Sequence, residues 1–442
     1  MSARELLVVN ARHPRAVLDA LRLALDGTGP AILPRRVEAD VATIDGELLE
    51  PGAGEDAESL ALPADAPSDA CLVIETSGST AAPKRVVLTA RALRASDAAT
   101  YRRLDELARR EQASSEAFPT RQWLLALPVE YVAGAQVLAR SIAAGTEPVA
   151  MPEGPFTAEA FLAACREMTG DRRYCSLVPA QLLRLLEAAE GARAQGAGVH
   201  ADAEPSLAAE LAEAVRAFDA ILVGGQSTPP EARARAESLG WRIVTTYGSS
   251  ETSGGCVYLG EPLPGVLARE EGGEILLSGP TLALGYLDDP ERTADRFVEV
   301  GGRRWYRTGD AGCVETDASG RVRVRVTGRL DDVIISGGEK VLLGAVEGIV
   351  RGMPGLEEAV VVGAPSAEWG EVPVVVAAGD ADAGNDAAFL EAVRDAVGAS
   401  LGRAARPSAI RRLEAMPLLP SGKPDRRAIA ALLREASAAD GR

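Results

Sequence analysis

Short, continuous apolar runs alternate with longer amphipathic stretches over the first part of the chain. Continuous runs of this length are typical of buried strands, and apolar residues at helical spacing predict helices between them. The predicted strands are residues 6–9, 71–74, 123–127, 148–151, 175–178, 221–223 and 242–246, and the predicted helices lie near 14–25, 93–108, from about 132, and near 157–168, 207–218 and 229–239. Such alternation indicates a mostly parallel sheet with helices on its faces, and ligands then gather beyond the carboxyl ends of the strands.

From about residue 272 the pattern changes to short β runs, and Arg alternates with Val over 321–326 as in a half-buried strand. Glycines and charges mix over 328–338, which is typical of a hinge, and a smaller α+β unit follows. The sequence therefore predicts an α/β protein. Its large N-terminal domain, residues 1–330, would contain mostly parallel sheets covered by helices plus a β-rich subdomain. A small mobile α+β domain, residues 331–442, would follow.

Composition and charge narrow the class of protein. The chain has 442 residues, 47% hydrophobic content and a formal net charge of −17, which argues against binding to nucleic acid or to an anionic membrane. It contains two histidines, so a histidine-based triad or multi-histidine metal site is nearly excluded. Its five cysteines form no C-x-x-C pair, and no apolar run approaches a membrane span, so we expect a cytoplasmic protein with free thiols.

The small number of lysines in the chain indicates residues with a functional role. Among 47 basic residues only Lys84, Lys340 and Lys423 are lysines, and each lies in a loop rich in Gly, Ser or Pro. A lysine carries a compact point charge on a flexible stem, whereas arginine carries a planar fork. Codon bias alone would not explain why all three lysines lie in such loops, so a functional role is favoured.

The loop from Thr76 to Lys84 follows a predicted buried strand and reads TSGSTAAPK. Hydroxyls, exposed backbone N–H groups and one cation suit a polyphosphate, although the string is not a Walker A loop. A Ser/Thr-rich surface turn is the structural alternative.

Four further stretches carry candidate site residues, each with a structural alternative. The segment 247–252, YGSSET, offers an aromatic ring, hydroxyls and a carboxylate suited to Mg²⁺, or is a polar turn. The segment 306–310, YRTGD, places an acid that suits a ribose diol, or is a solvated turn. The segment 328–338 is a hinge or a hairpin, and 420–423, PSGK, is a lysine loop or a frayed tail.

In this order and spacing the motifs resemble the acyl-adenylate-forming superfamily, from about residue 71 to 427. The stretches 125–141, 173–182 and 247–258 are most similar to its o-succinylbenzoate–CoA ligases of menaquinone biosynthesis, in their actinobacterial form. The resemblance implies an AMP-forming acid–thiol ligase that uses ATP, Mg²⁺ and CoA. It would adenylate a carboxylic acid and then transfer the acyl group to CoA.

The resemblance also implies site residues. Lys423, Lys84 and Glu251 would be catalytic, with Glu251 also the metal ligand, Asp331 the hinge, and Gly337 and Gly338 in the CoA channel. The implied ATP-binding residues are Thr76, Ser77, Gly78, Ser79, Thr80, Lys84, Gly224, Gly225, Gln226, Tyr247, Gly248, Ser250, Asp310 and Arg329. For the acid we expect Tyr131, Ser176, Gln181 and Arg184 to bind the substrate.

Three positions depart from the superfamily pattern. Ala81 and Arg85 stand where glycine is usual, and Glu130-Tyr131 replaces a usual histidine in the acyl-pocket motif. The acid is therefore open: another aryl or fatty acid, or an amino acid whose amine pairs with Glu130, are the enzyme alternatives. A nucleotide-binding sensor without catalysis is the non-enzyme alternative. We expect small-molecule partners, no nucleic acid, no membrane, and a homodimer.

Overall fold

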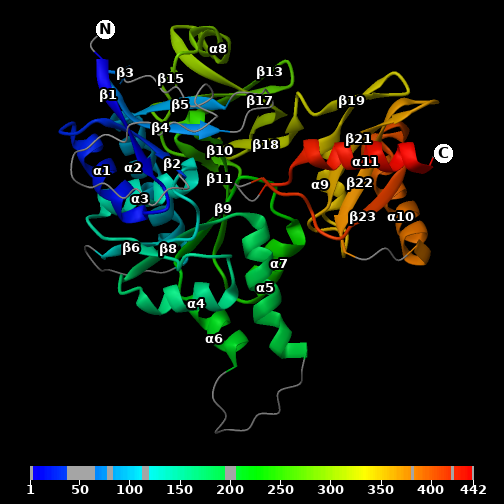
Figure 1. Cartoon of the computed structure of the whole chain (residues 1–442), viewed down its shortest axis with the longest axis horizontal. Coiled ribbons are helices and arrows are strands. Elements are labelled where there is room, and N and C mark those ends of the chain that lie inside the picture. Colours follow the sequence, from blue (N-terminus) through cyan, green and yellow to red (C-terminus); the bar gives the residue numbers. More distant parts are fainter. Residues whose placement is uncertain are drawn as a thin grey trace, which may run out of the picture. The chain divides into compact units, whose positions relative to one another are not determined.

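The computed structural model describes residues 3–36, 65–76, 83–111, 119–194, 206–379, 383–419 and 423–440. The chain divides into two compact units, which are described separately below (Figure 1). Unit 1 comprises Met1–Gly225, Ala236–Ala268 and Leu277–Arg307, and unit 2 comprises Gln226–Arg235, Arg269–Leu276 and Thr308–Arg442. Within the described residues, no helix is long and apolar enough to cross a membrane.

The first sheet of unit 1 has the strand order β15-β5-β4-β2-β1-β3. Its strands are β1 (Ala3–Asn10), β2 (Ala31–Arg35), β3 (Asp65–Pro67), β4 (Ala70–Thr76), β5 (Lys84–Thr89) and β15 (Gly285–Tyr286). β1, β2 and β4 are parallel neighbours, whereas β5 runs antiparallel to β4 and β15 antiparallel to β5. The apolar run 71–74 is fully buried in β4, as its pattern predicted.

The second sheet of unit 1 has the order β12-β11-β10-β9-β8-β6-β7. Its strands are β6 (Arg121–Leu125), β7 (Val149–Ala150), β8 (Arg172–Leu177), β9 (Ala220–Val223), β10 (Ile243–Ser249), β11 (Gly254–Tyr258) and β12 (Glu261–Pro262). The strands from β7 to β10 are parallel, and β11 and β12 add antiparallel pairs at one edge. The parallel part confirms the strand–helix alternation seen in the sequence.

Helices α1 (Pro14–Asp26), α2 (Ala90–Glu111) and α3 (Val132–Ala144) lie between these two sheets. α1 contacts β1, β2 and β4 of the first sheet, α3 contacts β6, β8 and β11 of the second, and α2 contacts strands of both. Helices α4 (Ala158–Glu167), α5 (Pro179–Ala194) and α6 (Leu207–Arg216) contact one another and gather below the second sheet in Figure 1. Helix α7 (Pro230–Ser238) follows β9. Unit 1 thus has the α/β architecture that the sequence predicted.

A third sheet supplies the predicted β-rich part. Its order is β13-β14-β17-β16, and β18 pairs with β17. The strands are β13 (Leu267–Glu271), β14 (Glu274–Ser278), β16 (Phe297–Val300), β17 (Arg303–Thr316) and β18 (Val322–Arg329), and the short helix α8 (Pro290–Arg296) precedes β16.

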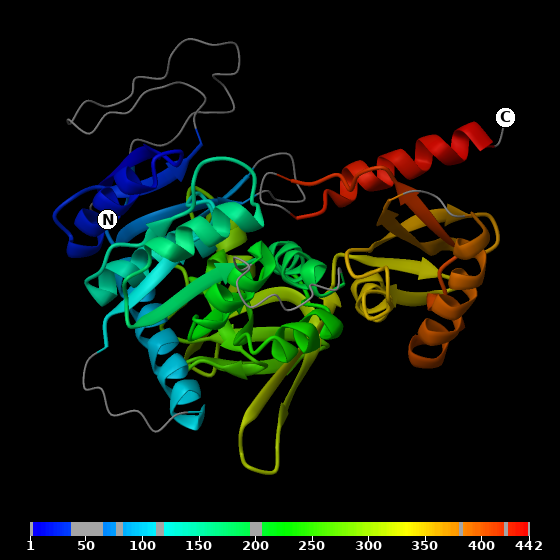
Figure 2. The ribbon, with the colours of Figure 1, turned by 90° about the horizontal axis from the view of Figure 1, so that it is seen from below.

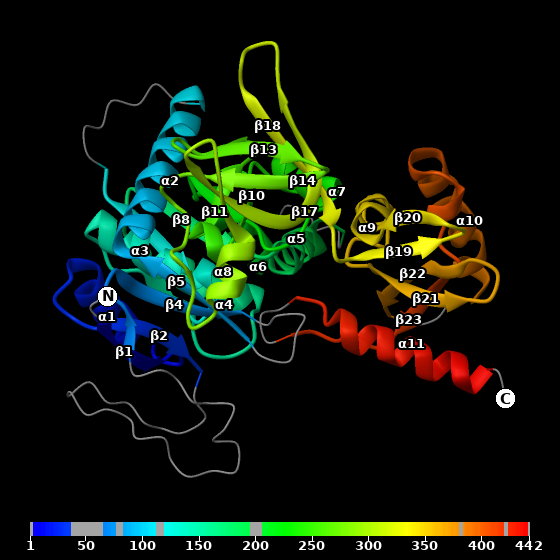
Figure 3. The same cartoon turned by 90° about the horizontal axis from the view of Figure 1, so that it is seen from above.

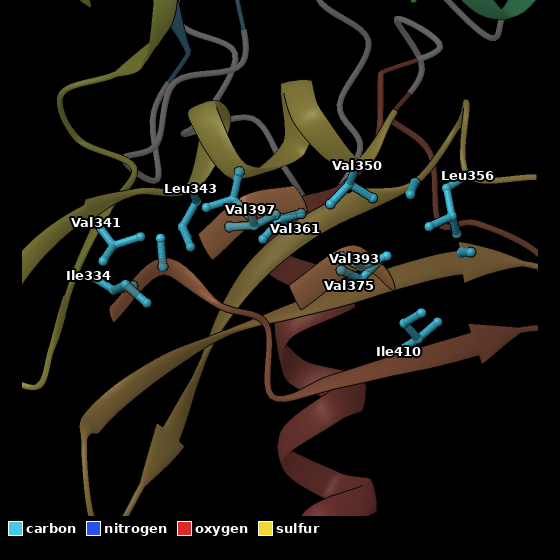
Figure 4. Packing of buried hydrophobic residues seen from close by; sticks show 14 of the residues in the cluster. Ile334, Val341, Leu343, Val350, Leu356, Val361, Val375, Val393, Val397 and Ile410 are labelled. Atoms are coloured by element: carbon cyan, nitrogen blue, oxygen red, sulfur yellow. The ribbon is translucent and has the colours of Figure 1, made fainter. Parts of the chain in front are cut away.

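The C-terminal sheet of unit 2 has the order β20-β19-β22-β21, with β23 paired to β22. Its strands are β19 (Val333–Ser336), β20 (Glu339–Leu342), β21 (Val360–Ser366), β22 (Gly370–Ala378) and β23 (Ala409–Leu413), and its helices are α9 (Leu343–Val350), α10 (Ala383–Leu401) and α11 (Arg426–Asp440). One face packs a valine-rich core against α9 and α10, in which Val361, Val375, Val393 and Val397 are fully buried (Figure 4).

The other face of this sheet packs against α11. Ile429 and Leu433 of α11 join a cluster with Val360, Val362 and other valines of β21 and β22. Figures 2 and 3 show α11 as a long red helix beside the strands of this sheet. Helix α11 is therefore anchored to the sheet, whereas Pro420, Ser421 and Gly422 of the predicted lysine loop lie outside the described residues.

Gly134 sets how closely α3 approaches the loop before it. A Cβ at this position would lie 2.1 Å from the carbonyl oxygen of Pro128 and 2.8 Å from that of Leu127. Since these are backbone atoms, no side-chain rotation can relieve the contact. Gly134 therefore fixes the path of residues 127–131, which include Tyr131.

We predict that Gly134→Ala lowers the free energy of unfolding by about 1–3 kcal/mol, because overpacking a rigid contact forces the backbone to shift. The control is Gly191→Ala on α5, where an added Cβ meets no atom within 4 Å. That variant should gain up to about 1 kcal/mol from helix propensity. Thermal and urea unfolding of both variants measure the difference, and equal stabilities would contradict the assigned packing.

Candidate active site

Thr76 and Lys84 lie opposite each other where β4 and β5 pair. Their segments enter and leave the loop that the sequence analysis assigned to phosphate binding. Ser77, Gly78, Ser79, Thr80 and the atypical Ala81 lie outside the described residues. Lys84 is thus the first residue of a strand, whereas the sequence placed it at the end of a loop. Strand pairing fixes its backbone beside that of Thr76.

Glu75 ties three strands together at the base of this loop. Its carboxylate accepts hydrogen bonds from Arg35 on β2, at 2.9 and 2.5 Å, and from Arg85 on β5, at 3.0 Å. Burial raises the pKa of Glu75, but the bonds from Arg35 and Arg85 outweigh it, so the pKa lies below its usual value. Arg85, which departs from the superfamily's glycine, has therefore a structural partner in this chain.

Glu251 lies in the turn Ser250–Thr252 after β10 and is 6% exposed. Its Oε1 accepts a hydrogen bond of 2.8 Å from the hydroxyl of Tyr286 on β15. Because β15 pairs with β5, Tyr286 lies opposite Val86, close in sequence to Lys84. Burial and the charge of Glu251 raise the pKa of Tyr286, so the phenol stays protonated and donates. Tyr286 was missed by sequence reasoning.

Residues of α2 and α3 hold the turn that carries Glu251. Ser253 has φ of 56°, in the left-handed region. Its carbonyl accepts from Gln136 at 2.6 Å and from Ser96 at 3.2 Å, and its hydroxyl donates to the carbonyl of Thr281 at 2.8 Å. These bonds hold an otherwise unfavourable backbone conformation, so they position the residues on both sides of it.

The strand ends of β9 and β10 also approach closely. A Cβ on Gly224 would lie 2.3 Å from the hydroxyl of Thr246, and one on Gly248 would lie 2.1 Å from the carbonyl of Gly254. Both glycines, which were predicted to bind ATP, are therefore required by packing as well. Gly225 has φ of 83°, and Tyr247 and the buried Ser250 follow Thr246 on the same segment.

In unit 2, Arg329 joins two of the predicted site residues. Its guanidinium donates to Asp310 at 2.9 Å and forms a bidentate pair with Asp331 at 3.0 and 3.1 Å. The hydrogen bond to Asp331 is the main reason that the pKa of Arg329 is raised. The strands β17 and β18 set this geometry, because Asp310 and Arg329 are register partners.

Gly337 and Gly338 form the turn between β19 and β20. Gly337 has φ of 56°, and a Cβ there would lie 2.6 Å from the ring of Trp369. Its N–H donates to the carbonyl of Trp369 at 2.9 Å. Lys423 is exposed, and its carbonyl accepts from the N–H of Leu419 at 2.7 Å.

The four residues predicted to meet the acid lie on different elements: Ser176 on β8, Gln181 and Arg184 on α5, and Tyr131 directly before α3. The side chain of Gln181 bonds to the N–H of Val178 and to the carbonyl of Ala126, both at 3.0 Å, so it links β8 to β6. Ser176 is buried in β8, and the exposed Arg184 donates to the carbonyl of Phe156 at 3.4 Å.

Glu130 and Tyr131 precede α3. The carboxylate of Glu130 is 3.4 Å from Arg36. Its Oε2 is buried and has no hydrogen-bond partner within the described ranges. Burial, then the charge of Glu130, raises the pKa of Tyr131.

Known families match this chain over most of its length. The profile of the family described as AMP-binding enzyme matches residues 31–266, and that of the AMP-binding enzyme C-terminal domain matches residues 345–423. The chain belongs to the AMP-binding enzyme family. This confirms the resemblance stated from the motifs.

Curated relatives are similar over nearly the whole chain. A probable 2-succinylbenzoate–CoA ligase of Mycobacterium tuberculosis is 35% identical over 419 residues, which cover 93% of this chain and 94% of the relative. A feruloyl-CoA synthase of Amycolatopsis is 27% identical and covers 79% of this chain and 69% of the relative. The chain is therefore an AMP-forming acid–CoA ligase.

Solved structures support the fold. The o-succinylbenzoate CoA synthetase of Bacillus subtilis in complex with its acyl-adenylate intermediate has a TM-score of 0.61 at 24% identity, covering 83% of this chain and 70% of that one. An amide bond synthetase from Marinactinospora thermotolerans has a TM-score of 0.64 at 23% identity, covering 97% and 80%.

The first prediction from the site concerns acid stability. The lowered pKa of Glu75 contributes stability above the unfolded-state value of about 4.3, and this contribution is lost as pH falls towards the folded pKa. Glu75→Gln should therefore be less stable than the unsubstituted protein at pH 7, and the gap between their melting temperatures should shrink below about pH 4.5.

The control is Asp26→Asn, which removes the carboxylate of an exposed pair with Arg94. It should change the melting temperature little at either pH. If the difference in melting temperature between Glu75→Gln and the unsubstituted protein stays constant with pH, the ionised carboxylate of Glu75 does not contribute the stability assigned to it.

The second prediction concerns the Tyr286–Glu251 bond. Tyr286→Phe removes a donor to a buried carboxylate, and a bond to a charged group is worth about 1.5–3 kcal/mol. We expect kcat/KM for acid-dependent ATP–pyrophosphate exchange to fall by roughly 10- to 100-fold if the full bond energy acts in the transition state. The control is Tyr258→Phe, whose hydroxyl instead contacts Thr100 at 3.1 Å. Equal losses in both variants would remove the special role of Tyr286.

Proposed function

We propose that this enzyme is an o-succinylbenzoate–CoA ligase of menaquinone biosynthesis. It would adenylate the acid with ATP and transfer the acyl group to CoA. The observation that carries the proposal is the 35% identity to a probable 2-succinylbenzoate–CoA ligase over 93% of the chain. The order of the site motifs within one chain supports it independently.

Adenylation needs little from the protein beyond position and charge. The substrate carboxylate attacks the α-phosphorus of ATP in line, and pyrophosphate leaves, so no general base is required. Lys84 would neutralise charge on the departing phosphates, and Lys423 would bridge the carboxylate and the α-phosphate. The paired strands β4 and β5 fix the backbone of Lys84, which supports this role.

Glu251 is the proposed magnesium ligand. A carboxylate has about four acceptor positions, and the bond from Tyr286 uses one of them. Mg²⁺ is typically held by one or two carboxylates together with substrate phosphates, so a single buried carboxylate fits this ion. When bound, the ion would neutralise negative charge on the phosphates.

The remaining nucleotide contacts follow the predicted assignment. Tyr247 would lie against adenine, Gly224, Gly225 and Gln226 would line that pocket, and Asp310 would accept from the ribose hydroxyls. The Arg329–Asp310 bond of 2.9 Å supports the last role, since it holds the carboxylate in one orientation.

The second half-reaction would follow a rotation of the C-terminal domain, residues 331–442, about Asp331. Rotation would withdraw Lys423 and bring the Gly337–Gly338 turn to the thiol channel, where CoA displaces AMP. The packing of Trp369 against Gly337 supports a rigid turn at this point.

The acid would bind near the segment before α3 and the start of α5. Tyr131 would pack the ring, and Ser176, Gln181 and Arg184 would meet the second carboxylate. One observation favours another acid as a second candidate: the buried Oε2 of Glu130 would repel a carboxylate and attract an amine or hydroxyl. A cytoplasmic location and a homodimer are the remaining parts of the proposal.

A pyrophosphate-release screen tests the function. The purified enzyme is given ATP, magnesium and one acid at a time, with and without CoA, and the acids include o-succinylbenzoate, ferulate, benzoate, fatty acids and aromatic amino acids. We expect o-succinylbenzoate to exceed the others in kcat/KM by at least about 100-fold, because a site built for a second charged group rejects analogues that lack it.

The product with CoA should be the thioester, identified by mass. A faster hydroxylated or amino acid substrate would favour the Glu130-based candidate instead. Release of pyrophosphate without any thioester would contradict the ligase assignment.

A further inference from the structure

Lys423 lies just before the start of helix α11. Leu418 and Pro424, on either side of Lys423 in the sequence, form a β-bridge. The carboxylate of Asp425 then accepts from the N–H groups of Arg427 and Ala428, at 3.1 and 3.0 Å, which caps the first turn of the helix. The position of Lys423 therefore depends on where α11 begins.

Arg426, the first residue of α11, is bound to three separate elements of unit 2. It donates to the carboxylate of Glu347 on α9 at 2.5 Å and to the carbonyl of Val361 on β21 at 2.7 Å. Its guanidinium also lies 3.4 Å from the carboxylate of Asp332, directly after the proposed hinge residue Asp331. One side chain thus links the start of α11 to a helix, a strand and the hinge segment.

The Glu347 end of this link is held rigidly. Glu347 is 7% exposed, and its Oε2 also accepts from the N–H of Val361 at 3.0 Å. Its Oε1 pairs with Arg351 at 3.0 Å, and Arg351 in turn donates to the carbonyl of Ala359 at 2.7 Å. A buried carboxylate with several donors has little freedom, so it makes a fixed anchor.

We propose that Arg426 is a positioning residue that holds Lys423 and Asp332, the neighbour of the proposed hinge residue Asp331, in one rigid body. Lys423 then reaches the α-phosphate in the adenylation step as part of that body. The inference rests on the proposed role of Lys423 and extends it to a residue that touches no substrate.

The packing of α11 separates this role from folding. Ile429 and Leu433 bury the helix against the valines of β21 and β22, so we expect the helix to stay docked when Arg426 is changed. Arg426 instead fixes the orientation of the first turn of α11, which is the part of the helix nearest in sequence to Lys423. Its loss should misplace Lys423, and a misplacement of about 1 Å can slow a reaction roughly 100-fold.

The test separates the two half-reactions in Arg426→Gln. We expect kcat for ATP–pyrophosphate exchange with o-succinylbenzoate to fall about 100-fold, while KM for ATP is unchanged. Thioester formation from supplied o-succinylbenzoyl-AMP and CoA should be unchanged, because Lys423 is withdrawn in that step. Arg426→Lys should recover part of the exchange, since it keeps the charge and loses the fork.

Two further variants complete the design. Arg427→Gln changes the neighbouring exposed arginine and should match the unsubstituted enzyme in both half-reactions. The double variant Arg426→Gln/Lys423→Ala should exchange no more slowly than Lys423→Ala, because residues that act through one group are not additive.

Normal ATP–pyrophosphate exchange in Arg426→Gln would overturn the inference, and so would an equal loss of both half-reactions. A double variant whose exchange is much slower than that of Lys423→Ala would also overturn it. If Lys423→Ala itself keeps exchange activity, the proposed role of Lys423 fails, and the inference fails with it. If Lys423→Ala loses exchange activity while Arg426→Gln keeps it, the role of Arg426 is wrong but the proposed role of Lys423 stands.

Discussion

A carboxylate that leaves water must be met by donors or cations, because an unpaired buried charge is strongly unfavourable. This constraint shapes both units of the chain. Glu75 is met by two arginines from neighbouring strands, Glu251 by a tyrosine hydroxyl, and Glu347 by two arginines and a backbone N–H. Each carboxylate thereby fixes elements that are distant in sequence.

The same constraint explains why arginine and lysine occupy different kinds of position in this chain. Arginine forms the structural pairs, because its planar fork can bond a carboxylate and a carbonyl at once, as Arg426 and Arg329 do. Two of the three lysines are instead the residues for which we propose contact with a phosphate, where a compact charge on a flexible stem is suited. Arg85 shows the distinction most directly: it stands beside Lys84, yet its partner is Glu75.

The sequence predicted what depends on local pattern. The apolar run 71–74 became β4, and the strand–helix alternation became the parallel part of the second sheet. It could not predict contacts made by the folded sheets. Tyr286 reaches Glu251 only because β15 pairs with β5, and neither strand has a distinctive pattern. The assigned roles at Lys84 and Lys423 came from motif resemblance, whereas the arginines that hold their surroundings have no motif signal of their own.

The two aspartates at the proposed hinge differ in how they are held, and this difference favours rotation between them. Asp331 pairs with Arg329, and both side chains are about half exposed, at 59% and 45%. Such a pair is worth roughly 0–1 kcal/mol, so it can break and reform as a domain turns. Asp332 is instead half-buried beside Arg426. Burial raises the pKa of Asp332, and the guanidinium of Arg426 lowers it. Breaking the contact with Arg426 would therefore leave a poorly solvated carboxylate without its cation. A rotation that separates Asp331 from Arg329 while Asp332 stays with Arg426 therefore moves Lys423 at a lower electrostatic cost than one that breaks the contact between Asp332 and Arg426.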